Sequence, residues 1–187
     1  MYKEIDEPEL ASACSAGDRL AEDELYRRYA ARVYTLCRRY TGEPDDAKDL
    51  MQEALIKALD KIGSFRYSGK GSLYGWISRI AINHSLNYLN RQRRRMLSLD
   101  TMVRDDIPEP TEDEMVRIPE EALIALISRL PDMRRMVFNL CCIDGYSHKE
   151  IGKMLGISEK GSSSELAKAK KQLKIEIRSY LDKEEKL

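Results

Sequence analysis

The sequence has few residues of the kinds that build disulfide frameworks, zinc sites or membrane spans. Its four cysteines, Cys14, Cys37, Cys141 and Cys142, form no CxxC pair, and its two histidines lie far apart in the chain. No apolar run approaches the ~20 residues that cross a bilayer. These absences predict reduced, buried thiols rather than disulfides, and neither a metal nor a cofactor.

A signal-peptide pattern is missing as well. The first ten residues, MYKEIDEPEL, are acidic and contain no apolar core, so we expect a cytoplasmic protein. Strand alternation and internal repeats of a useful period are also absent.

Acidic residues are absent from a long central segment. The chain has 32 basic and 32 acidic residues, yet no Asp or Glu lies between Lys61 and Arg95. Acids instead dominate from Asp100 to Glu121, where Pro108, Pro110 and Pro119 also occur. Like charges and prolines favour an extended linker over a packed element.

The linker divides the 187 residues into two regions of small-domain size. We predict an N-terminal helical domain over 1–96, an acidic linker over 97–119 and a C-terminal domain over 120–187. Apolar residues at three- and four-residue steps predict helices on both sides of the linker. These helices cover about residues 9–16, 20–40, 45–62, 75–95, 120–130, 132–142, 147–155 and 158–180. The expected fold class is all-α.

The sharpest local pattern is a helix-turn-helix in the C-terminal domain. Ser147 and Glu150 have capping-box spacing, Gly156 stands where a helix C-cap needs a left-handed residue, and Ser158 can cap the next helix. Such a unit places its second helix in the major groove of DNA. Its polar edge would be formed by Lys160, Ser162, Ser163, Ser164, Glu165, Lys168 and Lys171. A packed helical hairpin with a solvated lysine face is the alternative.

The acid-free segment combines cations with aromatic rings. Phe65, Tyr67, Tyr74, Trp76 and Tyr88 alternate with its Lys and Arg residues. Cations can meet phosphates while rings stack on unpaired bases, so the segment suits single-stranded nucleic acid. A basic helix whose aromatic residues belong to a core is the alternative.

Two further sets of polar residues are spaced so that each would form a row on one face of a helix. Arg79, Asn83 and Asn87 share one face, and Asn pairs well with adenine edges; a polar solvent face would look the same. Asp45, Asp49 and Glu53, with Gln52 beside them, form a carboxylate row. This second row would suit either a Mg²⁺ site for phosphoryl chemistry or a solvated or partner-binding face.

These patterns occur in an order that resembles a known family. The resemblance is to bacterial RNA polymerase sigma factors of the sigma-70 family, in the two-domain extracytoplasmic-function (ECF) group. It covers residues from about 9 to 174. The most specific stretches are 45–54 (DDAKDLMQEA), 64–67 (SFRY), 75–83 (GWISRIAIN), 130–131 (LP), 146–152 (YSHKEIG) and 155–159 (LGISE).

The resemblance implies a role for each surface. Asp45, Asp49, Gln52 and Glu53 would bind the β′ clamp of core polymerase, which explains the carboxylate row without a metal. The acidic linker would follow the RNA-exit path of the polymerase, β would be a further contact, and an anti-sigma factor would regulate the chain. A protein of this kind is not an enzyme and takes no small-molecule substrate.

The resemblance also implies two modes of DNA recognition. The −10 promoter element would be read as melted single strand, and the −35 element would be read as duplex by the helix-turn-helix. Near Lys160, Gly161 and Glu165 the sequence departs from the family pattern, so the order of −35 contacts stays open. Glu165 could accept from cytosine N4 or point away from DNA. The −10 contacts would be Phe65, Arg66, Ser72, Trp76, Arg79, Asn83 and Asn87.

Two other function classes remain open at this stage. A stand-alone helix-turn-helix regulator would bind duplex DNA without polymerase, but it leaves the acid-free aromatic segment unexplained. A metal-dependent nuclease would use Asp45, Asp49 and Glu53, and Asp49→Ala would abolish its activity. Cys141 and Cys142 could form a redox sensor or could pack in a core.

Overall fold

The computed structural model describes residues 5–93 and 110–184, and every regular element in these ranges is helical. The all-α prediction is therefore confirmed. The chain divides into two compact units, Met1–Tyr88 and Leu89–Leu187. The predicted domain boundary at residue 96 and most of the predicted linker lie outside the described residues, so those bounds stay predictions.

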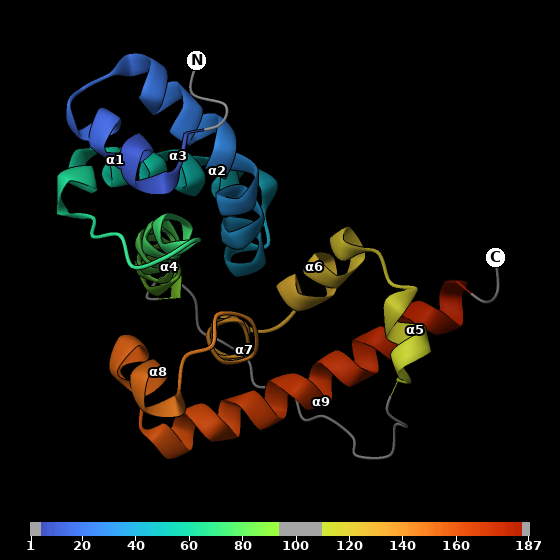
Figure 1. Ribbon diagram of the computed structural model, residues 1–187. Helices are drawn as coiled ribbons and strands as arrows, with labels where there is room; N and C mark the ends of the chain where they lie inside the picture. The colour runs from blue at the N-terminus through green and yellow to red at the C-terminus, as the bar shows by residue number, and fades with distance from the viewer. Residues whose placement is uncertain (1–4, 94–109, 185–187) are drawn as a thin grey trace. The chain divides into compact units, whose positions relative to one another are not determined.

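The first unit is built from α1 (Glu7–Ser15), α2 (Arg19–Thr41), α3 (Pro44–Lys61), the 3₁₀ turn η1 (Ile62–Ser64) and α4 (Ser72–Arg93) (Figure 1). α4 runs on past the end of the unit at Tyr88. Asp6 and Asp18 cap the N-termini of α1 and α2 through their side chains. Gly42 ends α2 at a φ of 80°, which only glycine adopts readily.

The core of this unit consists of apolar side chains repeated along each helix. Leu10, Leu25, Leu36, Leu55, Leu73 and Ile77 are all buried to below 2% exposure. Cys14 and Cys37 are free thiols in the same core, and burial raises the pKa of each to about 11. The prediction of buried, reduced cysteines holds for this pair.

The second unit is arranged along one long helix. It contains α5 (Glu112–Val116), α6 (Glu120–Ser128), α7 (Asp132–Phe138), the π-helical turn η2 (Asn139–Ile143), α8 (His148–Leu155) and α9 (Glu159–Glu184). α6, α7 and α8 each pack against α9 (Figure 1). A cluster of apolar side chains joins α6 to α9: Ile118, Leu126, Ile127, Leu130, Ala169, Leu173 and Ile177.

The π-helical turn differs from the single helix predicted over 132–142. The Asp144 N–H donates to the Asn139 carbonyl at 2.9 Å, which widens the last turn. Cys141 is half-buried and Cys142 is exposed, so Cys142 is not the buried thiol that the sequence predicted.

Residues 110–119 also differ from the extended linker that their prolines and acids favoured. Thr111 and Glu114 form a capping box that begins α5, and Glu114 pairs with Arg178 of α9 at 2.5 Å. Ile118 is buried in the apolar cluster and Met115 packs against it. Apolar burial and one ion pair therefore outweigh the local preference of an acidic segment for extended chain.

The helix-turn-helix pattern is confirmed in α8 and α9. Ser147 and Glu150 form the predicted capping box, and Gly156 is the left-handed C-cap of α8 at a φ of 69°. The Ser158 hydroxyl accepts from the Gly161 N–H at 2.9 Å and caps α9. Gly152 lies directly under the turn, because a Cβ placed there would stand 2.7 Å from the Ile157 carbonyl oxygen.

We therefore predict that Gly152→Ala destabilises the second unit by about 1–3 kcal/mol, since the added methyl meets backbone that cannot move aside. Chemical denaturation followed by circular dichroism would measure this. Gly75→Ala in α4 is the control, because a Cβ there meets no atom within 4 Å beyond its chain neighbours and its own helix backbone, and Ala favours helix. Equal stability of the two variants would contradict the tight contact.

A second prediction concerns pH. The Thr111 N–H and then Arg178 lower the pKa of Glu114 from 4.5 to about 2. A depressed pKa means that the Glu114 carboxylate stabilises the fold above about pH 4.5, and that this stabilisation is lost as the pH falls to about 2. Glu114→Gln should therefore be less stable than wild type at neutral pH, and the difference should shrink across that window.

Denaturation midpoints of the two proteins between pH 7 and pH 2 would test this. Glu120→Gln is the control, because that exposed carboxylate begins the neighbouring helix α6. A wild-type advantage over Glu114→Gln that stays constant with pH would show that the carboxylate charge is not the cause.

Candidate nucleic-acid interfaces

The exposed face of α4 has the composition that the sequence predicted. Arg79, Asn83 and Asn87 are all exposed, while Ile77 and Ala81 on the other side of the helix are fully buried. The polar side chains are therefore held in a row by a helix whose opposite face is anchored in the core. Such a row can present an amide and a guanidinium to base edges and phosphates.

The two aromatic residues of the loop before α4 differ in their exposure to solvent. Phe65 is only 8% exposed, and its ring lies 5.8 Å from that of Trp76 at a tilt of 57°. The Phe65 ring therefore packs against the Trp76 ring and has little exposed surface for stacking on a base. Tyr67 is 50% exposed, and it is the aromatic residue of this loop with the most free surface.

Two polar residues of the loop are engaged with the backbone. The Arg66 guanidinium donates to the carbonyls of Gly63 at 3.1 Å and Phe65 at 2.9 Å. The Ser72 hydroxyl accepts from the Ser68 N–H at 3.3 Å. Both side chains stabilise the loop conformation, and Arg66 is exposed, so their contacts with DNA stay predictions.

Tyr74 in the first turn of α4 packs against α2. Its ring stacks on Tyr29 of α2 at 6.2 Å, and the Arg32 guanidinium lies 3.5 Å from its centroid. The alternative in which aromatic residues of the acid-free segment serve packing is therefore correct for Tyr74.

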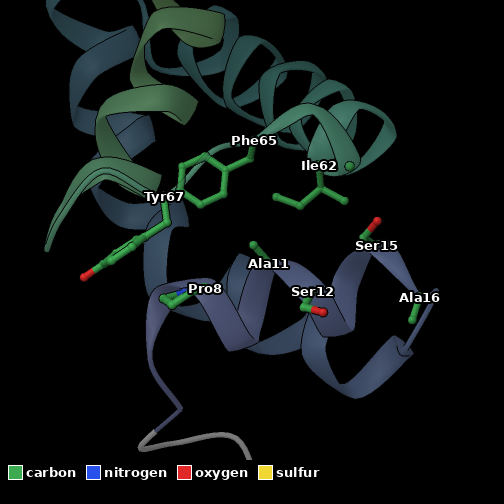
Figure 2. Close-up of a pocket in the computed structure, with 9 residues that line it drawn as sticks. Pro8, Ala11, Ser12, Ser15, Ala16, Ile62, Phe65 and Tyr67 are labelled. Atoms are coloured by element: carbon green, nitrogen blue, oxygen red, sulfur yellow. The ribbon is translucent and has the colours of Figure 1, made fainter.

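A hollow of about 410 Å³ lies between α1 and the loop that follows α3. In Figure 2, the Ile62 side chain lies over Ala11 and Ser12 of α1, and the Phe65 ring extends toward Tyr67, which stands at the edge of the hollow. Phe65, which lines this hollow, also packs against Trp76.

The carboxylate row on α3 is exposed along its whole length. Asp45, Asp49, Gln52 and Glu53 all face solvent, and Glu53 lies 3.6 Å from His84 of α4. Among residues 5–93 and 110–184, no three potential ligands lie close enough to hold a metal ion. Ile56 on the same face is 61% exposed; this residue was not among those predicted, although its spacing from Gln52 and Glu53 could have revealed it.

Helix α9 exposes several side chains of its predicted polar edge and buries one of them. Lys160, Ser163 and Ser164 are exposed. Ser162 is fully buried, with its hydroxyl 2.9 Å from Nδ1 of His148, so its placement on the exposed edge was wrong. Four buried residues of α9 continue its helical stripe, namely Leu166, Ala169, Leu173 and Ile177, and this stripe was the signal that could have shown the burial of Ser162.

Glu165 lies within an intramolecular ion-pair network. Its carboxylate is 2.9 Å from Lys168 and 3.7 Å from Arg134, whose side chain is only 5% exposed. Arg134 also donates to Gln172 at 3.0 Å. Of the two alternatives for Glu165, the structure favours the one in which the carboxylate serves the fold rather than a base.

No helix in the described part of the chain is long and apolar enough to span a bilayer. Two family models match the sequence: Sigma-70 region 2 matches residues 25–95, and Sigma-70 region 4 matches residues 120–173.

Curated relatives match over most of both chains. The ECF RNA polymerase sigma factor SigM of Mycobacterium tuberculosis H37Rv is 32% identical over 91% of this chain and 84% of the relative. The ECF RNA polymerase sigma-E factor of Escherichia coli K12 is 32% identical over 83% of this chain and 85% of the relative.

Solved structures show the same fold at lower identity. CnrH in complex with the cytosolic domain of CnrY matches with a TM-score of 0.50 and 21% identity, over 91% of this chain and 96% of CnrH. The sigma factor RpoE in complex with the anti-sigma factor NepR from Bartonella quintana matches with a TM-score of 0.50 and 15% identity, over 84% of this chain and 96% of RpoE.

Proposed function

Because the chain belongs to the ECF group of the sigma-70 family of RNA polymerase sigma factors, we propose that it binds core polymerase and directs transcription initiation at specific promoters. The observation that carries this proposal is the ordered pair of family matches, region 2 on the first helical unit and region 4 on the helix-turn-helix. The chain acts as a polymerase subunit and has no catalytic activity of its own. It works in the cytoplasm.

The exposed row on α3 binds the β′ clamp. Asp45, Asp49 and Glu53 present carboxylates to solvent, and Ile56 adds an exposed apolar side chain to the same helix. An apolar contact surrounded by charges is a common composition of a protein interface. The charges would guide orientation and raise the association rate, and the apolar contact would contribute affinity.

The α4 face reads the −10 element as unpaired strand. Arg79, Asn83 and Asn87 contact the strand, while Trp76 and Tyr67 offer ring surface to its bases. Phe65 keeps Trp76 in place, because the two rings are in contact. Removing a base from the stack costs a few kcal/mol, and these contacts recover that cost.

The α9 edge reads the −35 element as duplex. Ser163 and Ser164 lie at the N-terminal end of the helix, where short polar groups can reach base edges. Lys160, Lys168 and Lys171 hold phosphates. Lys160 is the one cation between Glu159 and Glu165, so hydrogen bonds contribute more of the −35 affinity than in a helix rich in Arg.

Regulation by an anti-sigma factor completes the proposal. One solved relative with the same fold is the sigma factor RpoE in complex with the anti-sigma factor NepR, and another is CnrH in complex with the cytosolic domain of CnrY. The part of the predicted acidic linker that precedes residue 110 follows the RNA-exit path, where its negative charge resembles RNA.

Run-off transcription with purified bacterial core polymerase tests the proposal directly. With a pool of genomic promoter fragments, specific start sites that depend on the chain would establish promoter-directed initiation. A polymerase that neither initiates nor co-elutes with the chain would reject it. The stand-alone regulator would then remain, although that class does not account for the region 2 match over residues 25–95.

Charge reversal on α3 should weaken the complex with core polymerase. We predict that Asp49→Arg lowers the affinity for core polymerase by about tenfold or more, because a cation replaces an anion that faces the clamp. Fluorescence anisotropy of labelled chain against core polymerase measures this. Asp23→Arg on the exposed surface of α2 is the matched control, and equal affinities for the two variants would remove the α3 row from the interface.

A lysine of α9 should set part of the salt dependence of −35 binding. We predict that Lys168→Ala reduces the slope of log affinity against log salt by about one unit, because one phosphate contact is lost. Lys183→Ala, near the exposed C-terminal end of the same helix, is the control. A slope that does not change in Lys168→Ala would place Lys168 off the DNA and leave it only its ion pair with Glu165.

A further inference from the structure

The N-terminus of α4 has no capping side chain of its own. Gly71, at a φ of 88°, precedes the helix and has no side chain, and the hydroxyl of Ser72 is occupied by the Ser68 N–H. The first N–H groups of a helix have no intrahelical partner and need an acceptor. The acceptor therefore has to come from elsewhere in the fold.

Glu7 of α1 supplies this acceptor from 64 residues away. The Gly71 N–H donates to both carboxylate oxygens at 3.1 Å, and the Leu73 N–H donates to one of them at 3.2 Å. A carboxylate at this position also meets the positive end of the helix dipole. Glu7 thus closes the N-terminus of α4 from a different helix.

The position of Glu7 is itself held by its neighbours. Asp6 caps α1 by accepting from the Glu9 N–H at 3.0 Å, and Arg28 of α2 donates to the Ile5 carbonyl at 3.0 Å. The Tyr29 hydroxyl lies 3.5 Å from the Glu7 carboxylate. Contacts on both sides of Glu7 therefore fix the start of α1 against α2.

The N-terminus of α4, which Glu7 caps, lies next to the surface proposed to bind the −10 strand. Trp76 lies one helical turn after Ser72, and Arg79 begins the exposed row of α4. Tyr74, between them and the cap, is stacked on Tyr29. The family match to region 2 begins at residue 25, so α1 and Glu7 lie outside it.

We propose that Glu7 is a positioning residue for promoter recognition: its carboxylate holds the first turn of α4, and with it the loop and Trp76, in the arrangement that receives the −10 strand. This inference rests on the proposed −10 role of α4. Glu7 itself contacts backbone amides and not DNA.

The test compares Glu7→Gln with Glu9→Gln. Both substitutions remove one negative charge from α1, but Glu9 is exposed, whereas Glu7 accepts from the Gly71 and Leu73 amides at the start of α4. Gln at residue 7 keeps the shape of Glu and loses the second acceptor oxygen. Because Trp76 is the one tryptophan of the chain, its fluorescence in the free full-length protein reports on the loop directly.

Glu7→Gln should shift the Trp76 emission and speed hydrogen exchange at the Gly71 and Leu73 amides. In holoenzyme it should weaken binding of a single-stranded −10 oligonucleotide by about 3- to 10-fold. The oligonucleotide carries the −10 sequence found by run-off transcription. Affinity for core polymerase should stay within about twofold of wild type, because the α3 face is intact. Glu9→Gln should resemble wild type in all four measurements.

The Arg79→Ala variant distinguishes failure of the positioning role of Glu7 from failure of the proposed −10 face. If it weakens strand binding while Glu7→Gln matches Glu9→Gln, the positioning role is overturned and the −10 face stands. If Arg79→Ala has no effect on strand binding, the proposed −10 face fails and the role of Glu7 fails with it. Equal losses of core affinity and strand affinity in Glu7→Gln would show general destabilisation of the unit, which also overturns positioning.

Discussion

Helix ends impose the constraint on which this structure depends. A fold built only of helices in its described part leaves backbone N–H groups unpaired at the start of every helix. Local side chains satisfy some of them, as Asp18 does for α2 and Ser147 for α8. For α4 the acceptor is Glu7, far away in the sequence. The surface that we assign to the −10 strand is thus tied to the first helix of the chain.

The separation of charge in the sequence corresponds to a separation of surfaces. Carboxylates are exposed along α3, amides and a guanidinium along α4, and lysines and serines along α9. Each row stands on a helix whose opposite side is buried, so each surface is presented rigidly. Opposite charges that meet inside a unit, such as Arg134 with Glu165, are taken up by the fold.

Much of the fold could be predicted from sequence because each signal is local. Helix periodicity, the Ser147–Glu150 capping box and the Gly156 cap all depend on residues within a few positions of each other. The exposure of Asp49, Asn83 and Ser163 follows from the phase of each helix. The docking of α5 was missed because its stabilising partners, Arg178 and the apolar cluster, lie far along the chain.

By itself the sequence determined the helical class, the order of the surfaces and the family, since these follow from composition, periodicity and motif order. Only the tertiary structure decided which members of each candidate set are free to bind. In the folded chain Ser162 is buried against His148, Phe65 packs against Trp76, and Glu7 accepts hydrogen bonds at the start of α4. These outcomes depend on contacts between residues distant in sequence, whose energies no local pattern contains.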